Sequence, residues 1–150
     1  MKLLLFICLL SGCCLLASRA EESRHIGDFI LGSHFKLTGG KITPIPIKPI
    51  KFRVYSDGIH VRVSAEGEEE ASTVFEIYRS DGIARQRPGR GALEVVPGLQ
   101  GINRNGGIVR HLRLTKDFLT MTTFPGVSDQ TLVTHCKALE PATPAEKTAP

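Results

Sequence analysis

Short apolar, strand-like runs separated by turn residues recur along this chain, and helical periodicity is nearly absent. No window longer than about two helical turns repeats apolar residues on one helix face without an interrupting Gly, Pro or β-branched cluster. Regularly spaced short strands with Gly and Asp between them are typical of an all-β sandwich or barrel. We therefore predict an all-β fold, an antiparallel meander of about eight short strands that forms a sandwich or a partly open barrel. The strand-like runs are residues 29–31, 34–37, 50–55, 59–64, 73–78, 93–96, 108–114, 118–124 and 131–139.

Three prolines restrict the segment 42–49. Pro44, Pro46 and Pro49 have no backbone N–H group, so they cannot donate to a sheet ladder. We expect this segment to lie on a sheet edge or to run as an extended connection.

One hairpin can be predicted in register from its turn at residues 57–58. This Asp-Gly pair suits a two-residue turn in which both residues have positive φ. Because a one-residue slip turns every side chain of a strand over, the register that separates apolar from polar side chains is favoured. The apolar face would then hold Phe52, Val54, Ile59, Val61 and Val63. The polar face would hold Tyr55 and His60, with Arg53 directly opposite Arg62.

The first twenty residues have the pattern of a secretory signal peptide. A positive residue, Lys2, precedes an almost wholly apolar stretch through residue 16, and small residues end at Ala20, where a signal peptidase would cleave. The stretch is too short for a membrane-spanning helix, so we expect no transmembrane helix in the mature chain. The protein is predicted to be exported, to the periplasm or the extracellular space. An alternative is a lipid anchor on Cys13, because residues 10–13 resemble a bacterial lipoprotein signal.

Cleavage would leave about 130 residues, the size of one ordinary domain. We predict a single β domain over residues 21–140, followed by a disordered Pro/Ala-rich tail over 141–150. Only Cys136 would remain in the mature chain, so no intramolecular disulfide is expected. The net charge would fall to about +2, which is too small to indicate a nucleic-acid partner.

Residues that could carry catalysis do not come in usable pairs. His135 and Cys136 are neighbours on one expected strand, so their side chains point to opposite faces and His135 cannot act as the base for Cys136. The alternation places the thiol inward, where it would be inert. None of the five histidines is spaced to share a metal ion with another on one element. We therefore expect no enzyme, no catalytic residue, no metal and no other cofactor.

Arginine side chains are the best candidates for binding. Guanidinium groups suit bidentate contact with phosphate, sulfate or carboxylate. Like charges that face each other across a sheet are destabilising unless solvent, a nearby acid or a bound anion offsets them. The ordinary alternative is a solvated face, with the acidic loop at 66–70 as its counter-charge. The candidate binding residues are Arg53, Tyr55, His60, Arg62, Arg85, Arg87 and Arg90.

These observations favour an exported, non-catalytic binding or structural module of the cell envelope. Its Arg-bearing sheet face would contact an anionic envelope polymer, a lipid headgroup or an acidic protein. The alternative is a small β-barrel that carries a lipid or another hydrophobic ligand, because Ile- and Val-rich strands fit that role equally well.

Overall fold

The computed structural model describes residues 23–86 and 93–140, and their regular secondary structure is almost entirely β-strand. A single 3-10 helical turn, η1 (Glu69–Ala71), lies between the fourth and fifth strands. The strands are β1 (Arg24–Thr38), β2 (Lys41–Pro44), β3 (Lys51–Ser56), β4 (His60–Ala65), β5 (Thr73–Arg79), β6 (Ile83–Gln86), β7 (Leu93–Val96), β8 (Gly98–Asn105), β9 (Ile108–Thr115), β10 (Phe118–Pro125) and β11 (Thr131–Ala138).

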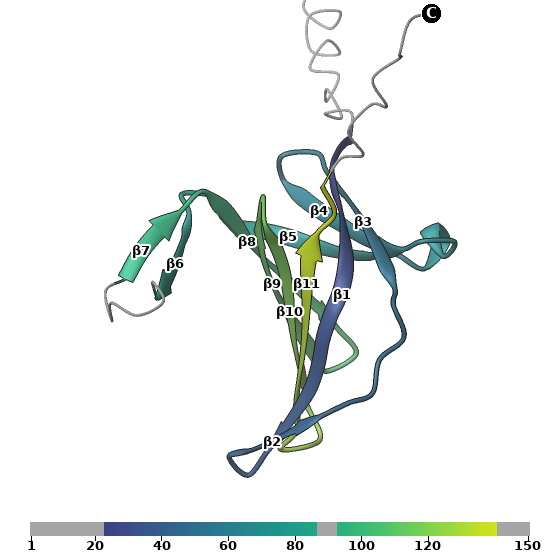
Figure 1. Ribbon diagram of the computed structural model, residues 1–150, viewed down its shortest axis with the longest axis vertical. Helices are drawn as coiled ribbons and strands as arrows, with labels where there is room; N and C mark the ends of the chain where they lie inside the picture. The colour runs from purple at the N-terminus through teal and green to yellow at the C-terminus, as the bar shows by residue number, and fades with distance from the viewer. Residues whose placement is uncertain (1–22, 87–92, 141–150) are drawn as a thin grey trace, which may run out of the picture.

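Eight antiparallel strands close into a barrel (Figure 1). Their order around the ring is β1-β3-β4-β5-β8-β9-β10-β11, and the pairing of β11 with β1 closes it. β2 extends the sheet along the second half of β1, whereas β6 and β7 form a separate hairpin, here called the flap, that stands out beside β8. The predicted all-β antiparallel fold is confirmed. Of the two expected arrangements the structure has the barrel, and the barrel is closed.

β1 is a single long strand, although the sequence suggested two short ones. Its first half pairs with β3, and its second half pairs with both β11 and β2. The register against β11 shifts between Leu31 and Ser33, so Gly32 lies at a β-bulge. A glycine inside a strand often marks such a bulge, and it does not end the strand here.

The proline-rich segment behaves as predicted. β2 pairs only with β1 among the described strands, which makes it an edge. Beyond β2 the chain runs extended beside β1, where the Ile45 N–H donates to the His34 carbonyl at 2.8 Å. Further along, the Ile50 carbonyl accepts from the Leu31 N–H at 2.9 Å.

β8 is not among the strand-like runs expected from the sequence. Gly101 is needed for close packing: a Cβ placed on it would lie 2.9 Å from the Phe75 Cβ. Real Cβ atoms essentially never approach that closely, so only glycine lets β8 lie against β5. The short strand β6 was not expected either.

The turn between β3 and β4 is longer than predicted. Ser56 pairs with Val61, so four residues, 57–60, separate the last paired positions of β3 and β4 where two were expected. The shift is by two residues, and the predicted inward positions of Val54 and Val61 are therefore kept. Ile59, which was predicted to face inward, lies in the loop and is 64% exposed.

Hydrogen bonds to the Asp57 carboxylate explain the longer loop. One carboxylate oxygen accepts from the Ile59 N–H at 2.9 Å and from the His60 N–H at 2.6 Å. Asp side chains commonly stabilise turns by accepting from the backbone two or three residues onward. The backbone preference of Asp-Gly alone predicts the shorter turn, and this side-chain capping favours the longer one.

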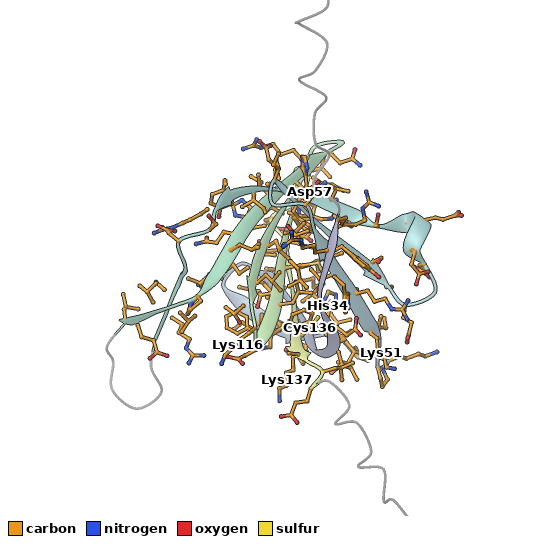
Figure 2. All side chains as sticks on the ribbon, turned by 90° about the horizontal axis from the view of Figure 1, so that it is seen from above. His34, Lys51, Asp57, Lys116, Cys136 and Lys137 are labelled. Atoms are coloured by element: carbon orange, nitrogen blue, oxygen red, sulfur yellow. The ribbon has the colours of Figure 1, made fainter. Side chains whose placement is uncertain are left out.

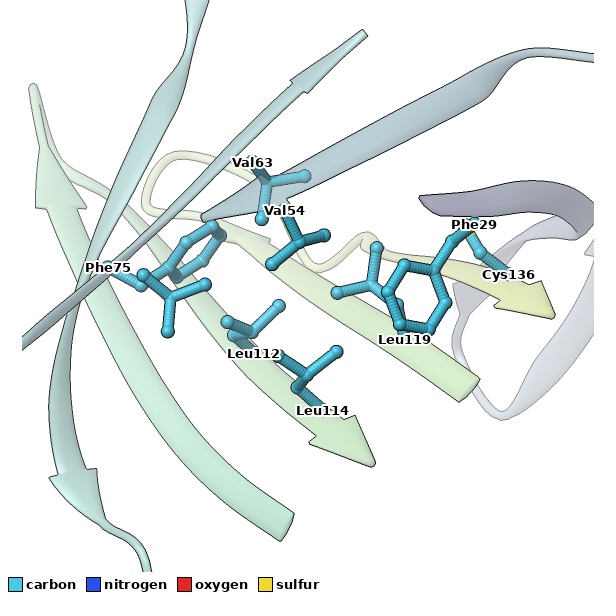
Figure 3. Close-up of a cluster of buried hydrophobic side chains, with 9 residues drawn as sticks. Phe29, Val54, Val63, Phe75, Leu112, Leu114, Leu119 and Cys136 are labelled. Carbon is cyan, nitrogen blue, oxygen red and sulfur yellow. The ribbon is translucent and has the colours of Figure 1, made fainter. Parts of the chain in front are cut away.

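Apolar side chains from both sides of the ring fill the middle of the barrel (Figure 3). Each member of this core is no more than 4% exposed. The barrel is therefore a packed core in its central part, with any usable space confined to its ends and outer surface. The core residues are Phe29, Val54, Val61, Val63, Phe75, Leu112, Leu114, Leu119 and Cys136.

Candidate functional site

The predicted arginine-bearing face is divided by the observed register. Arg53 lies opposite Ser64, and Arg62 lies opposite Tyr55, so the two arginines are not paired as the shorter turn required. Tyr55 and Arg62 line a small outer hollow of about 150 Å³ together with His60. Three of the predicted binding residues are thus brought together, without Arg53.

Arg53 forms ion pairs with two acidic neighbours. Its guanidinium contacts Glu69 at 3.2 Å and Glu66 at 3.4 Å. The pKa of Glu69 is held below its usual range, chiefly by backbone N–H groups and also by the charge of Arg53. This part of the surface matches the expected solvated face with the acidic loop as counter-charge.

His60 is held by the turn. Its Nδ1 lies 3.2 Å from the second carboxylate oxygen of Asp57. Beside it, the ring of Tyr55 packs against the ring of His25, with centroids 5.2 Å apart. Arg62 contacts no carboxylate closely enough for an ion pair within residues 23–86 and 93–140. Arg62 therefore carries the remaining cationic charge of this hollow.

Arg85 belongs to a different site. It lies on the flap, where its Nε donates to Glu94 across the hairpin at 2.6 Å. Both residues line a cleft that the sequence did not reveal. The predicted binding residues Arg87 and Arg90 lie outside the described residues.

The cleft has a volume of about 1210 Å³ and lies at one end of the barrel. Its walls come from the start of β1, the start of β8, the end of β9 and the end of β11, and the flap forms one side. The lining is mostly apolar and reaches the edge of the barrel core at Phe29 and Leu114. The other apolar lining residues are Ile26, Val96, Pro97, Leu99, Ala138 and Leu139.

Charged groups of both signs surround this apolar floor. His25 lies 2.9 Å from Asp28, and Arg85 is paired with Glu94. Lys116 also lines the cleft, as do Asp117 and Glu140. The rim therefore offers polar anchors of either sign and shows no strong preference for an anion or a cation.

No short motif could have revealed the cleft, because its walls come from segments that lie far apart in the sequence. Leu139 reaches it through a backbone hydrogen bond of 2.8 Å to the carbonyl of Asp28. The sequence holds one weak indication of the cleft. Ala138 and Leu139 are apolar, although the residues before and after them, Lys137 and Glu140, are charged. Their place beside β1 depends on barrel closure, which the sequence did not determine.

His135 and Cys136 point to opposite faces, as predicted. Cys136 is fully buried, and this burial raises the pKa of its thiol to about 12. His135 Nδ1 lies 2.9 Å from the Thr120 hydroxyl, and partial burial, with a smaller effect of Lys137, lowers the pKa of the imidazole. The thiol is therefore protonated and out of reach of the imidazole, which gives no nucleophile–base pair here.

Other classes of site find little support within residues 23–86 and 93–140. No group of three His, Cys, Asp or Glu side chains there could hold a metal ion. The same residues include no helix that is long and apolar enough to cross a membrane. Comparisons with protein-family models, curated proteins and solved structures find no match to this chain.

Proposed function

We propose that this protein is an exported, non-catalytic binding module that holds a small apolar molecule, such as a lipid acyl chain, in the cleft at the end of its barrel. The cleft itself carries the proposal: about 1210 Å³, open on one side and floored by apolar side chains. Ligand pockets are typically concave, mostly apolar and a few hundred to about 1,000 Å³ in volume, with a few polar groups for orientation.

The packing of the barrel supports a ligand position at its end. Fully buried residues such as Phe75 and Leu112 occupy its middle. A carrier of a hydrophobic ligand was the alternative function predicted from the sequence. In the version proposed here, the ligand lies against the end of the core, beside the flap. Burying an acyl chain there removes apolar surface from water on both partners, at about 25 cal/mol for each Å².

The balanced rim supports an uncharged or amphipathic ligand. Its ion pairs, His25 with Asp28 and Arg85 with Glu94, leave the apolar floor as the main source of affinity. A polar head would remain at the opening, where Lys116 and Asp117 can donate to it or accept from it.

The second part of the proposal is export, which is inferred from the signal-peptide pattern of residues 1–20. Mass spectrometry of the secreted protein gives its N-terminus: Glu21 corresponds to cleavage after Ala20, and an acylated Cys13 to a lipid anchor. Retention in the cytoplasm with Met1 still present would contradict export, and it would leave the cleft proposal untouched.

Titration with N-phenyl-1-naphthylamine, a dye that fluoresces in apolar surroundings, tests the cleft. Ile26→Asp places a charge on its wall at a side chain that is 44% exposed, so folding should survive. Ile42→Asp is the matched control, because Ile42 is 63% exposed on β2 and does not line the cleft.

We expect dye binding by the wild type, a loss of about tenfold or more in affinity in Ile26→Asp, and no change in Ile42→Asp. A second wall variant, Val96→Asp, should behave as Ile26→Asp does. Equal dye binding by all variants, or none by the wild type, would contradict the proposal.

A further inference from the structure

The inner face of the barrel changes from apolar to polar along its length. Five neighbouring strands, β8 to β11 and β1, place residues directly opposite one another in rows. The row nearest the cleft, the apolar row, is Leu99, Leu114, Leu119, Cys136 and Leu31. The next, the mixed row, is Gly101, Leu112, Met121, Thr134 and His34. The third, the polar row, is Asn103, Arg110, Thr123, Leu132 and Lys36.

The polar row faces the interior, as the apolar row does. Side chains alternate along a strand, so residues separated by two or four positions share a face. Leu114 and Cys136 are no more than 2% exposed, which fixes that face as the inner one. His34, in the mixed row, contacts the Thr134 hydroxyl at 3.0 Å, and Figure 2 labels His34 and Cys136 in the view from above.

Arg110 is held in place by an amide. Its Nη1 donates to the Asn103 side-chain oxygen at 3.1 Å. The Asn103 amide nitrogen in turn donates to the Val74 carbonyl at 2.8 Å. The guanidinium is thus oriented by neutral groups, and among the described residues its other N–H donors have no acceptor and can bind an anion.

Lys36 adds a second inward-facing cation at the other edge of the polar row. None of the residues in the mixed and polar rows is acidic. Across residues 23–86 and 93–140, no carboxylate forms an ion pair with Lys36 or Arg110. Both positive charges are half-buried on the same concave wall, where an anion bound near either of them would be stabilised.

A buried hydroxyl supports the same interpretation. Thr38 follows Lys36 by two residues on β1 and so shares its face. The Thr38 hydroxyl oxygen is buried and has no hydrogen-bond partner among the described residues. Buried polar groups are normally satisfied, which makes this hydroxyl a further donor without an acceptor at the same end of the barrel.

We propose that this polar end of the interior binds a phosphate group, at the opposite end of the barrel from the apolar cleft. Arginine suits bidentate contact with phosphate oxygens, and lysine supplies a point charge. The two backbones are three strands apart, roughly 14 Å along the sheet, and the long side chains on its concave face can close most of that separation. The phosphate group is free in solution or belongs to a lipid headgroup.

Two measurements on the full chain distinguish these sources. In the first, inorganic phosphate replaces chloride at constant ionic strength and its affinity is read from the shift in melting temperature. In the second, the protein is floated with phosphatidylcholine vesicles that contain or lack phosphatidic acid. The variants are Lys36→Gln and Arg110→Gln. The matched control is Arg104→Gln, because Arg104 is exposed on the outer face of β8, next to Asn103.

We expect each inner variant to weaken phosphate binding by about tenfold or more, and Arg104→Gln to leave it within about twofold of the wild type. Binding only to vesicles with phosphatidic acid, lost in the inner variants, identifies the headgroup as the source. If Arg110→Gln fails to fold, the phosphate affinity of Lys36→Gln alone tests the proposal. Absence of both kinds of binding, or an equal loss in Arg104→Gln, overturns the proposal. Dye binding in the cleft is independent of either result.

Discussion

The carboxylate of Asp57 accepts a hydrogen bond of 2.6 Å from the backbone N–H of His60, three residues onward. Together with the bond from the Ile59 N–H, this contact holds the pKa of Asp57 at about 2, below its ordinary value of 3.8. The turn therefore depends on the ionised carboxylate.

Asp57→Ala should lower the melting temperature at neutral pH by a few degrees, because two backbone donors lose their acceptor. The folded-state pKa is depressed, so this stabilisation is present above about pH 4 and is lost as the pH falls toward 2. Melting curves of the wild type and the variant should therefore converge on acidification. Asp129→Ala, an exposed carboxylate in the β10–β11 turn, should show no such difference.

Cys136 should resist alkylation in the native protein. Its burial raises the thiol pKa to about 12, so the reactive thiolate is scarce at mildly alkaline pH and is shielded from the reagent. Peptide mass spectrometry after iodoacetamide treatment should show the Cys136 peptide labelled only when guanidinium chloride is present. An exposed cysteine introduced by Ile42→Cys serves as the positive control, and rapid native labelling of Cys136 would contradict the buried assignment.

Gly101→Ala should destabilise the barrel by about 1–3 kcal/mol, because the new methyl group would overpack against Phe75. Gly32→Ala is the control: its nearest neighbour would be a carbonyl oxygen at 3.5 Å, an ordinary contact, and the change should stay within about 0.5 kcal/mol. Denaturant unfolding measures both. Equal stability of the two variants would mean that β8 and β5 pack less closely than described.

Contact with an anionic partner through the outer face stays a prediction, and the structure makes it depend on Arg62. Retention on immobilised heparin, used as a polyanion probe, should fall as salt rises. Arg62→Glu should elute at distinctly lower salt, whereas Arg53→Glu should change retention less, because Arg53 is already paired with Glu66 and Glu69. Equal effects of the two reversals would show that only net charge matters.

Strand periodicity was enough to predict the all-β class, and turn preferences predicted most strand boundaries. Alternation within a strand placed Cys136 inward and His135 outward without knowledge of any neighbour. These features are local, since each depends on residues a few positions apart.

Features that depend on distant neighbours were not predictable. Gly101 is required because Phe75 packs closely against it in the fold, and this contact cannot be read from the sequence around Gly101. The cleft and the polar end likewise combine strands that are far apart in sequence. Arg110 and Lys36 were therefore not among the candidate binding residues, although both are visible in the sequence as ordinary cations.

The pairing of β1 with β11 joins the first and last strands of the described fold, and it bears on the timing of function. Phe29 lies beside Ala138 at the cleft, and Lys36 lies opposite Leu132 at the polar end. Neither site can be complete until the ribosome has synthesised β11 and the chain has closed on its own beginning. A protein truncated before Thr131 would therefore lose the apolar cleft and the polar end together, and an exported chain would gain both only after its last strand has crossed the membrane.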